Sequence, residues 1–348
     1  MNNEENNSFA HIPMCQVGPV KIVGPEVGEI EVNIPLATFE TPLWPSVNRG
    51  ARLSQQCGGI LACVQDERMT RSILLQAPSA QVAVTTVSAF QERLTEVAEV
   101  VASTSRFCRL RDMHAEVVAD LIYLRLEMST GDAAGHNMVT GAAEAVMNWM
   151  LHTFSELSYV SISGNYCTDK KVSAVNGILG RGKRVIAELT VPEKLCRKYL
   201  KTTPDAVVDL NIKKNLIGTM LAGGVRSANA HFANMLLAFY LATGQDAANI
   251  VEGSQGFVHA ETRNNDLYFS TTLPNLIVGT VGNGKDLPFV EENLAALGCK
   301  EEREPGANAR RLAVVAAAAV LCGELSLLAA QTNPGELMEA HRRLERKG

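Results

Sequence analysis

The alternation of apolar and polar positions between about residues 70 and 163 predicts six regular elements. They are strands over residues 71–76, 106–112, 118–127 and 157–163, and helices over residues 79–101 and 136–152. Their order, βαββαβ, is that of the ferredoxin-like arrangement, in which both helices cover one face of the sheet. We therefore predict a small domain at residues 71–163 that is inserted into a larger one.

The flanking segments, residues 1–70 and 164–348, are expected to form one large, helix-rich domain, so the chain as a whole belongs to the α+β class. Local signals mark several helix ends: Thr203 and Ser227 as N-caps, and Gly244 and Gly298 after apolar helical runs. The longest apolar run, residues 312–322, is interrupted by polar residues before it could cross a bilayer core about 30 Å thick. We interpret it as a buried helix.

The composition is that of an ordinary globular protein. Of the 348 residues, 46% are hydrophobic and 20% are charged, and the net charge of -5 argues against nucleic acid as a partner. The 7 histidines and 8 cysteines are scattered without metal-ligand spacing, so neither a metal site nor a disulfide framework is predicted. Residues 1–8 are polar and unlike a secretory signal, and we expect a cytoplasmic protein without a membrane anchor.

A predicted strand with apolar Leu157, Val160 and Ile162 leads into residues 163–171, Ser-Gly-Asn-Tyr-Cys-Thr-Asp-Lys-Lys. Glycine and asparagine favour a turn that releases this segment from the sheet. A lysine beside carboxylates keeps its charge when partly desolvated and can stabilise an oxyanion formed from a carbonyl. We interpret the segment as a catalytic loop with Lys170 as its main group, although an Asp-Lys-Lys sequence alone is more often a solvated turn.

Three further titratable groups lie in settings that favour positioned side chains. Glu40 follows the apolar run 34–39, Asp246 follows Gly244 at a predicted helix end, and His341 lies among arginines on the last predicted helix. Alone, Glu40 is more often a surface carboxylate, Asp246 part of a turn between helices, and His341 a surface histidine. Spacing by itself does not bring the three groups together.

These residues, in this order, resemble the catalytic portion of the hydroxymethylglutaryl-coenzyme A (HMG-CoA) reductase family. The resemblance covers nearly the whole chain and is carried by residues 34–40, 46–50, 69–71, 163–171, 229–231, 244–248 and 279–282. The sequence Asn-Tyr-Cys-Thr-Asp-Lys-Lys at residues 165–171 is most similar to that of class I members of the family. The family fold, a large domain with an inserted ferredoxin-like domain, agrees with the element order predicted above.

The resemblance implies a four-electron reduction of HMG-CoA to mevalonate and CoA, by two hydride transfers from two molecules of NADPH. It implies that Lys170 stabilises the carbonyl oxygen, Glu40 donates a proton, Asp246 orients both, and His341 protonates the departing CoA thiolate. Active sites of the family form between subunits. A homodimer, or an assembly of dimers, is therefore implied, with Lys170 reaching Glu40 and Asp246 of the neighbouring chain.

Binding residues are implied in the same way. For the hydroxymethylglutaryl portion they are Arg71, Ser163, Asp169, Lys171, Lys214 and Asn234, and for the CoA portion Ser46, Asn48, Arg49 and His231. For the cofactor they are Ser105, Arg106, Phe107, Asp132, Gly135, Asn137, Gly282 and Arg346. An arginine beside a serine at 105–106 suits a 2′-phosphate and favours NADPH over NADH, and no GxGxxG fingerprint of a Rossmann domain is present.

The chain departs from the family pattern at two places near the expected cofactor. Ala134 and His136 replace two methionines, and Asn283 and Lys285 replace a glycine and a threonine. Two other functions therefore stay open: a catalytically weak protein that binds CoA thioesters, and a reductase of a related carboxylated acyl-CoA. Retention of all four catalytic groups favours an active reductase, because binding alone needs no such set.

Overall fold

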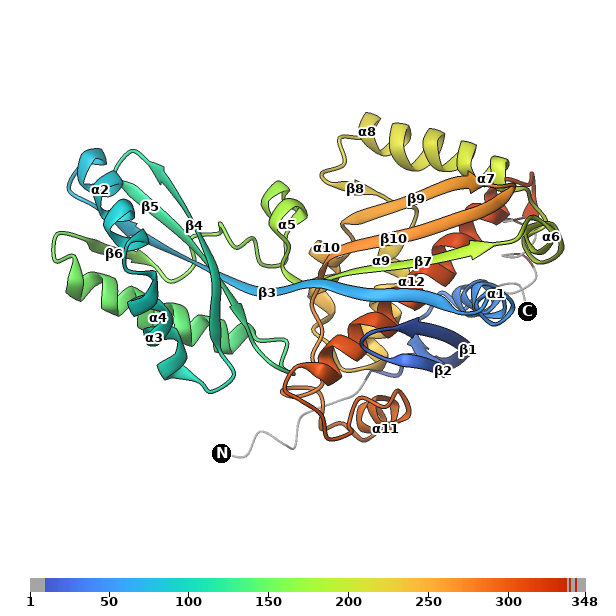
Figure 1. Ribbon diagram of the computed structural model, residues 1–348, viewed down its shortest axis with the longest axis horizontal. Coiled ribbons are helices and arrows are strands. Elements are labelled where there is room, and N and C mark those ends of the chain that lie inside the picture. Colours follow the sequence, from blue (N-terminus) through green and yellow to red (C-terminus); the bar gives the residue numbers. More distant parts are fainter. Residues whose placement is uncertain (1–9, 337, 339–341, 343–348) are drawn as a thin grey trace.

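The computed structural model describes residues 10–336 together with residues 338 and 342. Two lobes share one long strand, β3 (Ile60–Gln76), which runs from one lobe into the other (Figure 1). Residues 60–68 of β3 pair within the large lobe and residues 69–76 pair within the small lobe. The mixed α+β architecture predicted from the sequence is confirmed, and its mixed sheet is continuous through β3.

The large lobe contains a sheet with the strand order β2-β1-β3-β7-β10-β9-β8. Besides β3, its strands are β1 (Met14–Gly24), β2 (Gly28–Ala37), β7 (Gly182–Val191), β8 (Ser227–Ala228), β9 (Gly256–Arg263) and β10 (Asp266–Leu276). The pairs β1/β3 and β8/β9 are parallel and the other pairs are antiparallel. The prediction of a helix-rich large domain missed this sheet. Its β1/β2 and β9/β10 pairs are local hairpins that were overlooked, whereas β1/β3, β3/β7, β7/β10 and β8/β9 join partners distant in sequence.

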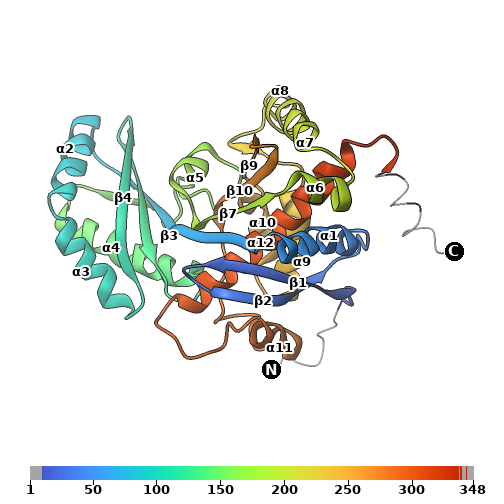
Figure 2. The ribbon, with the colours of Figure 1, turned by 45° about the vertical axis from the view of Figure 1, so that its right-hand side comes forward.

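A central helix, α12 (Ala307–Gln331), packs against β7 and β3 and against the helices α1 (Leu43–Gln56) and α9 (Phe232–Ala242) (Figure 2). Among the described residues it is the one helix long and apolar enough to cross a membrane. However, 94% of its most apolar stretch is buried inside the fold, as is typical of a core helix that is apolar all round. The prediction of a buried helix at residues 312–322 is confirmed.

The small lobe has a separate core around Phe90, Leu124 and Met147. Its antiparallel strands lie in the order β4 (Arg109–Val118), β5 (Leu121–Ser129), the second half of β3, and β6 (Ser158–Ser161). The helices α2 (Ala80–Gln91), α3 (Leu94–Thr104) and α4 (His136–Thr153) lie together on one side of these strands (Figure 2).

Each of the six elements predicted for the small lobe is found, but with different ends. The helix expected at residues 79–101 is two helices, α2 and α3, interrupted at residues 92–93. The strand expected at residues 71–76 is the end of the 17-residue β3, and β6 has only 4 residues. The boundary predicted at residues 70/71 therefore falls inside a continuous strand.

Shorter helical segments complete the large lobe. They are α5 (Ala174–Leu179), α6 (Glu193–Leu195), η2 (Cys196–Leu200), α7 (Pro204–Leu210), η3 (Asn211–Gly218), α8 (Thr219–Leu221), η4 (Ala247–Asn249), α10 (Ile250–Gly253) and α11 (Pro288–Ala296).

Three of the four predicted caps are confirmed. Thr203 Oγ1 accepts a hydrogen bond from the N–H of Ala206 at 3.2 Å, at the start of α7. Gly244 and Gly298 follow α9 and α11 with φ angles of 63° and 67°, the left-handed conformation that glycine adopts without strain. The prediction for Ser227 is wrong: this residue lies in β8, because pairing with β9 overrides the local cap signal.

The contact between α1 and α12 supplies a test of core packing. A Cβ added at Gly50 would lie 2.5 Å from the Cα of Cys322, between two packed helices. Gly50→Ala should therefore lower the free energy of unfolding by about 1–3 kcal/mol in denaturant titrations. Gly141→Ala in α4 is the matched control, because a Cβ there meets nothing within 4 Å, and it should stabilise by about 0.5–1 kcal/mol. Equal effects of both substitutions would contradict the close approach of α1 and α12.

Candidate active site

The loop of residues 163–171 is held in place by its backbone. The N–H of Lys170 donates to Glu252 Oε1 at 3.2 Å, and Cys167 is buried. Asn165, Thr168 and Lys170 have φ angles of 59°, 46° and 55°. Such angles are unfavourable for residues other than glycine and persist where the surroundings impose them. The Lys170 side chain is therefore presented from a constrained loop.

Lys170 forms an ion pair with Asp246, with Nζ 2.8 Å from Oδ2. The hydrogen bond that Lys170 donates to this carboxylate raises the pKa of Lys170. Burial favours a higher pKa for Asp246, but hydrogen bonds from Lys170 and from the N–H of Ala248 bring the pKa below its usual value. Both groups are thus charged at neutral pH.

The pair lies within one chain, whereas the resemblance implied that Lys170 reaches Asp246 of a neighbouring chain. The reason is local. Glu252 of α10 holds the Lys170 backbone beside the end of α9, and Asp246 lies two residues beyond Gly244 at that end.

Two buried side chains that we did not predict support the loop. Arg181 Nη2 lies 2.7 Å from Asp169 Oδ1, and its Nη1 donates to the carbonyl and Oγ1 of Thr70 at 2.6 and 2.8 Å. Glu252 accepts from Arg181 Nε at 3.4 Å, and burial raises the pKa of its carboxyl. For Arg181 the available sequence signal was weak: it is a charged residue between two glycines at the start of an apolar strand.

A cavity of about 720 Å³, named here the catalytic cavity, opens beside the ion pair. Residues predicted for catalysis, substrate and cofactor line it together: Arg71, Gly135, Asn137, Asp169, Lys170, Asp246 and Gly282. His136 and Lys285, two departures from the family pattern, line it as well. Within the described part of the chain, Arg71 Nε and His136 Nε2 are buried without a hydrogen-bond partner. A ligand can supply such a missing partner.

A second cavity, of about 410 Å³ and named the Glu40 cavity, contains the other predicted groups: Glu40, Ser46, Arg49, His231 and Asn234. Glu40 Oε2 accepts a hydrogen bond from Asn234 Nδ2 at 3.0 Å. None of the residues that the structure describes lines both this cavity and the catalytic cavity. The single chain therefore places Glu40 in a different cavity from Lys170 and Asp246.

Two polar residues of α12 organise the Glu40 cavity, and neither was predicted. Glu324 is buried, and its Oε1 lies 2.7 Å from His231 Nδ1. Ser326 Oγ lies 3.0 Å from Ser46 Oγ and also accepts from Arg49 Nε at 3.0 Å. Polar residues within the apolar run of α12 were the signal that could have found them.

Four predicted substrate-binding residues line neither cavity. Asn48 Oδ1 accepts a hydrogen bond from the N–H of Gly18 at 3.0 Å, and the N–H of Ser163 donates to Ser161 Oγ at 3.0 Å. Lys171 Nζ donates to the carbonyl of Asp169 at 3.1 Å. Lys214 Nζ donates to Asn215 Oδ1 at 3.2 Å. Burial lowers the pKa of Lys214, and the charge of Glu324 partly opposes this. Their roles toward substrate stay predictions.

A third cavity, of about 660 Å³ and named the arginine cavity, is lined by Arg106, Phe107, Arg111 and Arg310 among others. The Arg106 guanidinium lies 4.7 Å from the centre of the Phe107 ring. Ser105 Oγ accepts from the N–H of Phe107 at 3.2 Å. Glu67 also lines the cavity, 3.2 Å from Arg310 and 3.8 Å from Arg111. Three arginines and one carboxylate leave an excess of positive charge where the resemblance implied a phosphate.

Asp132 has a contact that we did not predict. Its two carboxylate oxygens accept hydrogen bonds from the N–H groups of Gly306 and Ala309, both at 2.9 Å, at the start of α12. A carboxylate there satisfies free N–H groups and complements the helix dipole. Asp132 lines none of the three cavities, and its predicted contact with the cofactor stays a prediction. His341 and Arg346 lie outside the described residues.

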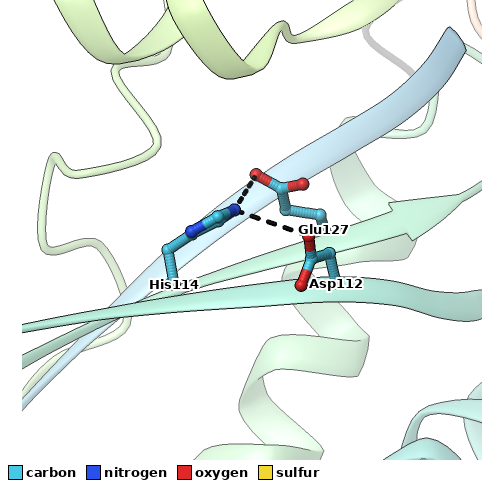
Figure 3. Close-up of side chains that lie close together, drawn as sticks. All are labelled: Asp112, His114 and Glu127. Carbon is cyan, nitrogen blue, oxygen red and sulfur yellow. Dashed lines mark ion pairs between the residues drawn. The ribbon is translucent and has the colours of Figure 1, made fainter.

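One cluster in the described ranges has the spacing of metal ligands: Asp112, His114 and Glu127 (Figure 3). His114 Nε2 lies 3.6 Å from each of the two carboxylates. However, Glu127 is already paired with Arg68 and with Arg125. Because these two guanidinium groups already occupy the Glu127 carboxylate, it is not available to a cation, and we assign the cluster no metal.

An ammonium group with its carboxylate, facing a cavity bordered by glycines and a helix start, is an arrangement suited to an enzyme that stabilises negative charge on a carbonyl oxygen. The family follows from comparison. A model of the family described as "Hydroxymethylglutaryl-coenzyme A reductase" matches residues 2–346, and the chain belongs to this family. The predicted family and its enzymatic activity, that of an HMG-CoA reductase, are thereby confirmed.

Relatives of known name support the same family. The 3-hydroxy-3-methylglutaryl-coenzyme A reductase of Pyrococcus abyssi is 44% identical over 99% of this chain and 85% of its own length. That of Aeropyrum pernix is 43% identical over 100% and 82%. The class II reductase of Streptococcus pneumoniae, solved bound to NADPH, superposes with a TM-score of 0.75 at 20% identity, over 95% of this chain and 88% of that one. At this identity the structure supports the fold.

Removal of Arg181 tests how the loop is supported. Arg181→Met leaves the buried Glu252 and the partly exposed Asp169 without their shared cation and should lower the free energy of unfolding by about 3–5 kcal/mol. Arg197→Met is the matched control, because Arg197 forms an exposed pair with Glu193 at 2.7 Å and should change stability by less than about 1 kcal/mol. Denaturant titrations measure both. Similar small losses would show that Arg181 does not anchor the loop.

Proposed function

We propose that this chain reduces HMG-CoA to mevalonate and CoA, with NADPH as the reductant. The observation that carries the proposal is the Lys170–Asp246 ion pair at 2.8 Å, in a cavity shared with residues expected to bind substrate and cofactor. Each turnover would consume two NADPH and two protons and release two NADP⁺. The retained ion pair disfavours one of the two alternative functions, binding without catalysis, because binding alone needs no group that stabilises an oxyanion.

Lys170 acts on the carbonyl oxygen in both reductive steps. In the first, hydride bonds to the thioester carbon and the carbonyl electron pair moves to oxygen, which becomes an oxyanion. In the second, hydride bonds to the aldehyde that remains after CoA departs. The raised pKa of Lys170 keeps its ammonium charged, so it can stabilise the negative oxygen each time. Asp246 orients that ammonium.

Proton transfer completes both steps. The electron pair of the first oxyanion re-forms the carbonyl bond as the carbon–sulfur bond breaks. The thiolate leaves with the electron pair of that bond, and His341 donates a proton to it. Glu40 donates a proton to the alkoxide formed by the second hydride, and Asn234 holds Glu40 with the 3.0 Å hydrogen bond. His231, Ser46, Asn48 and Arg49 would contact the CoA portion. Arg71, Ser163, Asp169, Lys171 and Lys214 would surround the carboxylated end, where cations are required.

NADPH supplies the hydride when it is bound, and the described residues fit it. The start of α4 has no side-chain cap, and its N-cap Gly135 has a φ angle of 95°, so free N–H groups are available to a phosphate. Asn137 and Gly282 border the same cavity. Ser105 and Arg106 would hold the 2′-phosphate, with Phe107 beneath the guanidinium. Arg346 and Asp132 are further expected contacts.

We propose that the small lobe, residues 71–163, is a ferredoxin-like cofactor domain and that residues 1–70 and 164–348 form the substrate domain. Its strand order and helices support this assignment. We also propose a cytoplasmic homodimer. The separation of Glu40 from the catalytic cavity supports a site completed by a second chain, with Glu40 of one chain facing Lys170 and Asp246 of the other.

A direct assay tests the reaction. Purified protein mixed with HMG-CoA should consume NADPH, followed by absorbance, and should consume NADH more slowly. Lys170→Ala should lower kcat by at least about 10²-fold, because the oxyanion loses its cation. The exposed pair contributes little to stability, so the variant's unfolding free energy should change by less than about 1 kcal/mol. Turnover at the normal rate by a folded Lys170→Ala variant would remove this role.

Mixing two inactive variants tests the shared site. Glu40→Gln and Lys170→Ala chains, unfolded and refolded together, should regain about a quarter of wild-type activity, because half of the dimers are mixed and each has one intact site. Each variant refolded alone is the control. If Glu40 and Lys170 acted within one chain, no mixed dimer would contain an intact site, and activity would not return.

A further inference from the structure

Lys285 is a buried lysine beside the ion pair that none of the steps above uses. It lines the catalytic cavity, and only 7% of the residue is exposed. Its Nζ donates a hydrogen bond to the carbonyl of Gly244, two residues before Asp246. The backbone there is closely packed, since a Cβ on Gly244 would lie 2.1 Å from the carbonyl oxygen of Gly284. The end of α9 therefore holds the ammonium in place.

We infer that Lys285 is a positioning residue for the reduction, acting through Asp246 on the charge of the catalytic cavity. The inference rests on the proposed function, in which Lys170 stabilises an oxyanion. Lys170 and Asp246 alone form a neutral pair, whose field at a developing negative charge is weak because the two charges oppose each other. With Lys285 protonated, the three groups carry one net positive charge, which favours the oxyanion.

Other charged and titratable groups also face this part of the cavity. They are Arg71 of β3, His136 of α4, Asp169 and Lys170 of the 163–171 loop, and Asp246 beyond α9. Asp286, the neighbour of Lys285 in sequence, is exposed and does not line the cavity. Burial lowers the pKa of Lys285 to about 8, and the charge of Asp246 opposes the shift. Burial and Arg181 lower the pKa of His136, so His136 is neutral over the same pH range.

The charge of Lys285 determines how kcat should depend on pH. Lys285 is charged below about pH 8 and neutral above it, so the cavity loses a positive charge as the pH rises through this value. Lys170 keeps its charge over this interval, because the hydrogen bond with Asp246 raises its pKa. The kcat of the wild-type protein should therefore fall as the pH rises through about 8.

Two substitutions at this position separate charge from packing. Lys285→Met keeps an unbranched side chain without charge; it should lower kcat about tenfold at neutral pH, change the KM for HMG-CoA little, and remove the fall near pH 8. Lys285→Arg keeps the charge and should retain most of kcat, with the fall moved to higher pH. A wild-type rate and profile in Lys285→Met would overturn the inference. So would equal losses in both variants with the fall near pH 8 unchanged, because the role would then be structural.

An NMR titration of protein labelled at the lysine ε-carbons gives a readout without substrate or cofactor. One signal, absent from Lys285→Met, should titrate near pH 8, and at lower pH in Asp246→Asn, where the opposing carboxylate is lost. If that signal titrates near the ordinary lysine value of about 10.4, the inference is wrong even where HMG-CoA is reduced. If it titrates as expected but the wild-type protein reduces no HMG-CoA at any pH, the proposed function is what fails.

Discussion

The buried guanidinium of Arg181 is the contact on which the geometry of the catalytic loop depends. It joins three parts of the chain: Thr70 at the point where β3 passes between the lobes, Asp169 in the 163–171 loop, and Glu252 on α10. A buried arginine of this kind is stable only while all its partners are in place, since each lost partner leaves an uncompensated charge. The position of Lys170 therefore depends in part on Thr70, Arg181 and Glu252, which do not line the catalytic cavity.

The local pattern of the sequence was sufficient for elements whose signals lie within a few residues. The elements of the small lobe, the buried helix at residues 312–322 and the cap at Thr203 are of this kind. The pattern failed where partners are distant: β3 continues across the boundary predicted at residue 70, and Ser227 pairs with Gly256 in place of capping a helix. Pairing between distant strands depends on the whole fold, and the pattern of apolar and polar residues within one segment does not reveal it.

The same distinction applies to the site. Lys170, Asp246 and Glu40 could be named because their segments resemble a family, and the structure pairs the first two. Arg181, Glu252 and Glu324 could not be named, because a buried charge is recognised by its partners, which come from other elements. For Asp132 the resemblance named a residue but not its contact: it was expected at the cofactor, and in the structure its carboxylate binds the start of α12.

Contacts between backbone segments explain why side-chain differences can matter at this site. Gly279 approaches the segment after Asp132 so closely that a Cβ would lie 2.3 Å from the N of Ala134. Ala133 also forms a bridge with Val281. These contacts tie the glycine-containing border of the catalytic cavity to the large lobe, which leaves little freedom for the backbone to shift. A different side chain at position 136 or 285 therefore changes the charge and hydrogen bonding of the catalytic cavity without moving its backbone.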